Sequence, residues 1–139
     1  MRHLRGVLCL SALALAGCQT DSRQQVLATD RSQVELRSIS TRAFDTNDRR
    51  QVFRAVIGTF QDLGFVVDRA DETLGTVSAT KLQNYVLRMT VTVRARGATQ
   101  VAVRASGQYN LDAISDPKPY QDFFNALEQA LFLTANQID

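Results

Sequence analysis

Residues that carry metal-binding and nucleophilic chemistry are scarce in this chain. It has one histidine, two cysteines and no tryptophan, and His3, Cys9 and Cys18 all lie within the first 18 residues. The rest of the chain therefore has no Ser-His or Cys-His nucleophile pair and no ligand set for a His/Cys zinc site. It also has no G-x-G-x-x-G motif and no P-loop. We expect no enzyme activity, no cofactor and no metal.

Two-carboxylate chemistry is the catalytic alternative that the composition leaves open. The acids that would have to supply it are Asp62, Asp68, Asp71, Glu72, Asp112 and Asp116. They lie at predicted helix ends and turns, where capping and solvation are the usual reasons for an acidic side chain. The same scarcity excludes disulfides beyond Cys18, so the fold depends on its core alone.

The chain also lacks a long apolar run. Residues 1–5 form a short basic segment. The apolar run that follows, residues 6–16, is about 11 residues long, whereas a membrane-spanning helix needs about 20. A basic start followed by a short apolar segment is the layout of a secretory signal peptide. We therefore predict a signal peptide over residues 1–17.

The end of this segment, Leu15-Ala16-Gly17-Cys18, resembles a bacterial lipobox. The resemblance implies that a diacylglyceryl group is added to the Cys18 thiol and that the chain is cut just before it. Gln19 follows, and by resemblance to the enterobacterial sorting rule a residue other than Asp at this position implies the outer membrane. The expected location is the inner leaflet of the outer membrane, facing the periplasm. The alternative is an ordinary signal peptide that ends near a cysteine.

The predicted mature chain has no excess of basic or acidic residues. The formal charge of +2 comes from 16 basic and 14 acidic residues, and loss of Arg2 and Arg5 with the signal leaves 14 of each. The pI of about 8.8 is therefore due in part to the basic residues of the predicted signal peptide. We expect no binding to nucleic acid.

The remaining sequence predicts one α+β domain after a polar tether. Residues 18–33 are predicted to be the lipidated Cys and a flexible tether, and residues 34–139 a single domain. Strands are expected at 34–44, 65–68, 74–81, 85–95 and 101–111, with helices at 48–63 and from about 117. The expected fold is a two-layer sandwich in the order β-α-β-β-β-α, with a mostly antiparallel sheet of four to five strands and two helices on one face.

Period-two alternation is clearest on both sides of a turn at residues 96–99. Apolar side chains at Tyr85, Leu87, Met89, Val91, Val93 and Ala95 continue, after the turn, with Val101, Val103, Ala105, Tyr109 and Leu111. This pattern predicts an antiparallel hairpin with one buried face. In the last helix, Tyr120, Phe123 and Phe124 form an aromatic stripe that is expected to pack in the core.

The other face of the predicted sheet is basic. Residues 73–111 contain five basic residues and no acid, and alternation places Arg88, Arg94 and Arg104 together on the solvent side. Two interpretations remain open. One is an ordinary solvated sheet face, and the other is a binding face for an anionic group, such as a lipid headgroup phosphate or an acidic protein patch.

The order of elements resembles that of small outer-membrane lipoproteins with helices packed on one sheet. Examples are the accessory lipoproteins of β-barrel assembly and the lipoprotein plug of lipopolysaccharide export. The run R-A-F-D-T…A-V-I-G-T-F-Q-D-L-G-F-V-V-D also resembles a group of small uncharacterised envelope lipoproteins. The resemblance implies a fold and a location, but it supplies no site residues.

The sequence thus predicts a lipid-anchored envelope lipoprotein that acts as a non-catalytic binding or assembly accessory to a protein complex. Its expected partners are the membrane, through the anchor, and an envelope protein. The alternative is a lipid or glycolipid carrier that uses the helix-sheet cleft or the Arg-rich sheet face. A purely structural role in the envelope is the third interpretation.

Overall fold

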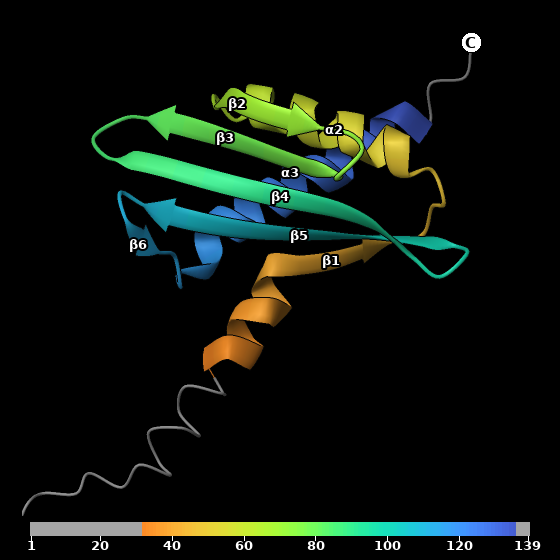
Figure 1. Ribbon diagram of the computed structural model, residues 1–139, viewed down its shortest axis with the longest axis horizontal. Coiled ribbons are helices and arrows are strands. Elements are labelled where there is room, and N and C mark those ends of the chain that lie inside the picture. The colour runs from red at the N-terminus through yellow and green to blue at the C-terminus, as the bar shows by residue number, and fades with distance from the viewer. Residues whose placement is uncertain (1–31, 136–139) are drawn as a thin grey trace, which may run out of the picture.

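The computed structural model describes residues 32–135, and they form one antiparallel sheet with helices packed against it (Figure 1). After a helical segment at residues 32–40, the elements are β1 (Thr41–Phe44), α2 (Arg49–Asp62), β2 (Val66–Asp71), β3 (Thr76–Leu82), β4 (Val86–Arg96), β5 (Gln100–Tyr109), β6 (Asp112–Ala113) and α3 (Pro117–Ala135). The predicted α+β class, with an antiparallel sheet and helices on one face, is confirmed. The sheet has six strands because the short β6 adds to the five expected.

The connection between the two sheet edges is made by α2. The strand order is β1-β5-β4-β3-β2, and β6 pairs with β5 beside β1. Strands β2 to β5 follow one another as antiparallel neighbours, whereas β1 lies at the opposite edge from β2. Helix α2 therefore crosses the covered face from the β1 edge to the β2 edge. Helix α3 packs beside it on the same face.

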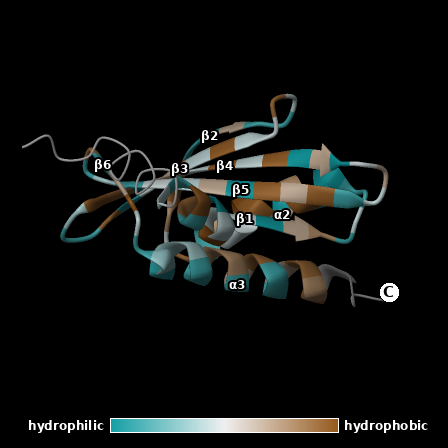
Figure 2. Cartoon of the chain, turned by 90° about the horizontal axis from the view of Figure 1, so that it is seen from below, coloured by the Kyte–Doolittle hydropathy of each residue, from teal (hydrophilic) through white to brown (hydrophobic). Residues whose placement is uncertain are grey.

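The core lies between this face and the two helices. Alternate residues of β4 and β5 are buried, and the strands change between apolar and polar along their length in Figure 2. Helix α2 contributes Val52, Val56 and Phe60, and the aromatic stripe of α3 packs against them, with 5.1 Å between the ring centroids of Phe60 and Phe123. The prediction that this stripe belongs to the core is confirmed.

Helix α2 has the boundaries that its sequence predicts. The Asp48 carboxylate accepts a hydrogen bond from the Gln51 backbone N–H at 2.9 Å, which satisfies one of the free donors of the first turn. At the other end, Gly64 has a φ of +80°, the left-handed conformation in which chains commonly leave a helix. Among the described residues, no helix is long and apolar enough to cross a membrane.

The hairpin of β4 and β5 is also confirmed, but it ends earlier than predicted. Arg96 pairs with Gln100 across the turn, and the register continues to the pair Leu87 and Tyr109. The chain then turns at Asn110, which has a φ of +54°. Leu111, predicted as a strand residue on the buried face, instead lies in this turn with 89% of its surface exposed.

The predicted first strand is wrong over most of its length. Residues 34–40 belong to the helical segment 32–40, and only Thr41–Phe44 form a strand. Leu36 and Ile39 stand three residues apart, on one side of a helix, and both pack against the core. The last two residues of the predicted tether are therefore helical. Cys18 and the rest of the tether, with the signal peptide, lie outside the described residues.

The free edge of the sheet is irregular. In β2 the register against β3 shifts between Val67 and Arg69, so that Asp68 forms a β-bulge. The Asp68 carboxylate accepts a hydrogen bond from the Thr80 hydroxyl at 2.6 Å. The bulge interrupts the regular pairing of this edge strand.

Candidate functional site

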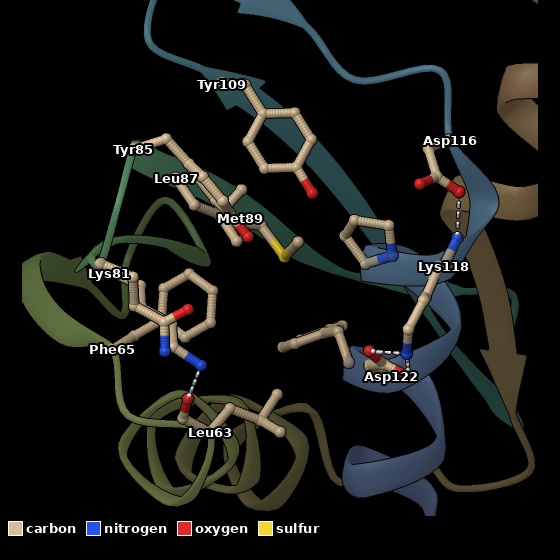
Figure 3. Close-up of a pocket in the computed structure, with 13 residues that line it drawn as sticks. Leu63, Phe65, Lys81, Tyr85, Leu87, Met89, Tyr109, Asp116, Lys118 and Asp122 are labelled. Carbon is tan, nitrogen blue, oxygen red and sulfur yellow. Dashed lines mark hydrogen bonds and ion pairs between the residues drawn. The ribbon is translucent and has the colours of Figure 1, made fainter.

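A pocket lies at one end of the sandwich, where α2 ends and α3 begins (Figure 3). Its volume is about 210 Å³, and we call it the end pocket. Its lining residues are Leu63, Phe65, Lys81, Gln83, Tyr85, Leu87, Met89, Tyr109, Asp116, Lys118, Pro119, Asp122 and Phe123. They come from both helices and from the neighbouring ends of β3, β4 and β5, so the pocket exists only in the folded chain.

Lys81 forms one wall of the end pocket because of its position in β3. Its partner in the register is Leu87, which places it on the covered face after Val77 and Ala79. The Lys81 ammonium donates to the backbone carbonyl of Leu63 at 2.8 Å and lies 5.8 Å from the centre of the Phe65 ring. A cation at the last carbonyls of α2 interacts favourably with the helix dipole. Lys81 therefore joins the end of α2 to the sheet.

Two tyrosines line the opposite wall. The rings of Tyr85 and Tyr109 meet edge to face, with 4.9 Å between their centroids. Burial raises the pKa of Tyr109 above its ordinary value, and the nearby Tyr85 and Asp116 raise it further. The neutral phenol is thus the favoured form, and the Tyr109 hydroxyl points into the pocket in Figure 3.

The rim at the start of α3 carries paired charges. The Lys118 ammonium lies 2.8 Å from one carboxylate oxygen of Asp122, and the Lys118 backbone N–H donates to Asp116 at 3.0 Å. The hydrogen bond and the charge of Asp122, with a smaller effect from Asp116, raise the pKa of Lys118. Since this ammonium is exposed, the pair gives the rim its polarity and contributes little to stability.

These features give the end pocket an apolar floor and a polar rim. The floor contains Phe65, Leu87, Met89 and Phe123, all of them buried, while the rim offers both charge signs and a phenol. Pockets for drug-sized ligands have about 300–1,000 Å³, so this one accommodates a ring or a short stretch of acyl chain. In residues 32–135 no group of three or more His, Cys, Asp or Glu side chains is placed to hold a metal.

The three predicted arginines lie on the uncovered sheet face, which we call the Arg face. Arg94 pairs with Ala102 and Arg104 pairs with Thr92, so Arg94 and Arg104 are diagonal neighbours on adjacent strands. Arg88 pairs with Gln108, four residues along β4 from Thr92, a distance of about 13 Å. The structure therefore brings two of the three together and separates the third.

A shallow depression of about 470 Å³ lies between Arg94 and Arg104. Small hydroxyl and methyl side chains form the rest of its lining: Thr41, Thr90, Thr92, Ala102 and Ser106. Among the described residues, no carboxylate forms an ion pair with Arg88, Arg94 or Arg104. The depression is therefore shallow and rich in hydroxyl groups, with two arginines on its border.

The sequence did not identify the residues of the end pocket. It predicted a helix-sheet cleft as one place for a ligand, but it assigned no residue to it. One signal was available, because Lys81 continues the buried alternation of Val77 and Ala79 and so stands out as a charged residue on an apolar face. Tyr109 and Lys118 gave no comparable signal.

Arg42 was also missed. It lies on the covered side of β1, where it forms an ion pair of 2.6 Å with Glu128 and stands 5.2 Å from the centre of the Phe124 ring. It therefore belongs to the contact between β1 and α3. Compared with known proteins, the chain matches no protein-family model and no curated protein sequence.

Proposed function

We propose that this chain is a non-catalytic binding protein of the bacterial cell envelope, held to the membrane by a lipid on Cys18, that binds an acidic surface of a partner protein through its Arg face. The observation that carries the proposal is the position of Arg94 and Arg104, which are diagonal neighbours on the uncovered sheet face. Neither forms an ion pair with a carboxylate among the described residues.

Arginine is well suited to this role. Its planar guanidinium donates two parallel hydrogen bonds to one carboxylate and is more weakly hydrated than the lysine ammonium, so it is used often in interfaces. Arg94 and Arg104 stand beside a shallow depression lined by threonine, serine and alanine, which a partner can approach closely. The near-neutral charge of the predicted mature chain favours a local contact over long-range attraction.

The experiment is photo-crosslinking combined with charge reversal. A crosslinking residue at Ala102, inside the depression, should capture a protein partner in intact envelopes, and the double change Arg94→Glu and Arg104→Glu should abolish the adduct. The control is Arg54→Glu, an exposed arginine of α2. Capture that is equal in the charge-reversed and control proteins would refute the role of the Arg face.

Lipidation has a separate test. Cys18→Ser removes the thiol that would carry the lipid, so the protein should leave the membrane fraction or stay uncleaved. Unchanged fractionation together with an unchanged mass of the N-terminal peptide would refute the anchor.

The end pocket favours a second candidate function, a carrier for a lipid or glycolipid. Its buried floor and polar rim fit an amphipathic ligand. Lipid extracted from the purified protein should decrease when Leu87→Trp fills the pocket, while the Arg94→Glu and Arg104→Glu protein should retain it. Thermal unfolding of both variants controls for loss of the fold.

A further inference from the structure

Two turns at the pocket end of the sheet expose large apolar side chains. Leu82 is 75% exposed, Tyr85 is 44% exposed and Leu111 is 89% exposed, and we call these three residues the apolar tip. The turns are attached to each other, because the Asn110 N–H donates to the Val86 carbonyl at 2.7 Å and the Asn110 side chain accepts from the Val86 N–H. These two hydrogen bonds hold the two turns of the tip next to each other.

Packing within the domain does not explain the exposed positions of Leu82 and Leu111. Leu82 ends β3 on the side away from the core, because its neighbour Lys81 faces the helices. Leu111 is turned outward by the left-handed conformation of Asn110. Single exposed apolar residues are common, but a cluster on neighbouring turns marks a surface that meets another phase or molecule. Tyrosine beside leucine is typical of the boundary between membrane and water.

The chain enters the domain at the β1 edge of the sheet. Strand β1 begins at Thr41 opposite Arg104 and runs toward Val101, away from the tip. The helical segment 32–40 lies next to the start of β1, on the half of the sheet that carries β6, as Figure 1 shows. Cys18 precedes residue 32 by 14 residues, which span at most about 50 Å. A lipid on Cys18 would therefore keep the domain close enough to the bilayer for the tip to reach it.

Charge around the tip excludes simple attraction to anionic lipid. Lys81, Arg88 and Lys118 are accompanied by Asp112, Asp116 and Asp122, so the basic residues have no local excess. Contact with a membrane would depend on burial of the apolar side chains, which is insensitive to salt and needs no anionic headgroup.

We propose that the apolar tip inserts into the headgroup layer of the membrane that carries the lipid anchor. The inference rests on the proposed lipidation of Cys18. In this orientation the end pocket opens toward the lipid, and Arg94 and Arg104, farther from the tip on the Arg face, stay clear of the bilayer for a partner. The opposite end is the competing contact, because Leu74, Phe132 and Leu133 are exposed there.

The absence of tryptophan allows a direct test. The full-length lipidated protein, carrying one reporter, is reconstituted into vesicles of phosphatidylcholine and phosphatidylethanolamine with bromine on the acyl chains. Leu111→Trp or Leu82→Trp should show blue-shifted emission and several-fold stronger quenching than Leu74→Trp, the matched control at the other end. High salt should leave the quenching unchanged.

A second variant tests the tip itself. With Tyr85→Trp as the reporter, Leu82→Asp and Leu111→Asp together should remove the quenching while unfolding by urea stays the same, because both leucines are exposed. Weak quenching at all positions in protein that floats with the vesicles would overturn the docking inference alone, as would stronger quenching at Leu74→Trp. Protein that fails to float would refute the anchor, and the docking inference with it.

Discussion

The Tyr120 hydroxyl makes two buried hydrogen bonds that fasten β5 to the start of α3. It accepts from the Gly107 N–H at 3.2 Å and donates to the Ile114 carbonyl at 2.9 Å. Tyr120→Phe leaves the Gly107 donor without this partner, and we expect the free energy of unfolding to fall by about 1–3 kcal/mol, the penalty for a buried unsatisfied polar group. Urea unfolding followed by circular dichroism measures this.

Thr59 is the matched control for that change. Its hydroxyl is also buried, but it has no hydrogen-bond partner among the described residues. Thr59→Val removes a polar group that is already unsatisfied, so stability should be unchanged or higher. An equal loss in both variants would show that the Tyr120 hydrogen bonds contribute nothing specific.

Tyr109 should make stability sensitive to alkaline pH. Its pKa is raised from the ordinary value of 10.0, first by burial and then by the nearby Tyr85 and Asp116. Because the folded-state pKa lies above the unfolded one, the neutral Tyr109 phenol contributes to the free energy of unfolding. This contribution is complete below pH 10.0 and is lost as the pH rises through the folded-state pKa. The difference in absorbance at alkaline pH between wild type and Tyr109→Phe should titrate above 10.0. A midpoint at or below that value contradicts this.

Among the elements, α2 depends on its N-terminal cap. Asp48→Ala removes the acceptor of the Gln51 N–H and a negative charge at the positive end of the helix dipole. We expect a loss of about 0.5–2 kcal/mol in the free energy of unfolding. Asp62→Ala, at the other end of the same helix, should be neutral or slightly stabilising. The prediction is wrong if both variants unfold at the same urea concentration.

The elements also differ in how far the sequence could predict them. Strands β4 and β5 and the two long helices were found because each buries one face along most of its length, so their periodicity is sustained. The sequence of the helical segment 32–40 predicts a strand because Val34, Leu36 and the β-branched residues after them imitate alternation. The packing of this segment at the edge of the sheet distinguishes the helix from a strand, since Val34 is exposed while Leu36 and Ile39 contact the core.

The candidate sites show the same limit. Alternation placed Arg88, Arg94 and Arg104 on one face, and six residues along β4 already separate Arg88 from Arg94 by about 20 Å. Alternation does not fix how two strands align, so only the register shows that Arg104 lies beside Arg94. The end pocket could not be predicted from the sequence, because two helix ends and three strand ends must meet to form it. Contacts between residues so distant in sequence leave no periodic signal.

For the whole molecule, resistance to hydrogen exchange should follow the position of each strand in the sheet. Strand β4 lies in the centre, paired with β3 and β5, and Val91 and Val93 are fully buried. We expect the slowest amide exchange there and the fastest in the two-residue β6, because opening β4 exposes the whole core. Exchange in β6 that is as slow as in β4 would contradict this order.

The bulge at Asp68 has a consequence for molecules crowded together on one surface. A regular edge strand presents a row of free N–H and C=O groups on which another chain can extend the sheet. In β2 the row is interrupted at Asp68, and the charges of Asp68 and Arg69 lie beside the gap. A second copy would find matching groups over only a few residues. Extension of the sheet from β2 by a neighbouring copy is therefore disfavoured, even where molecules are held at high local concentration.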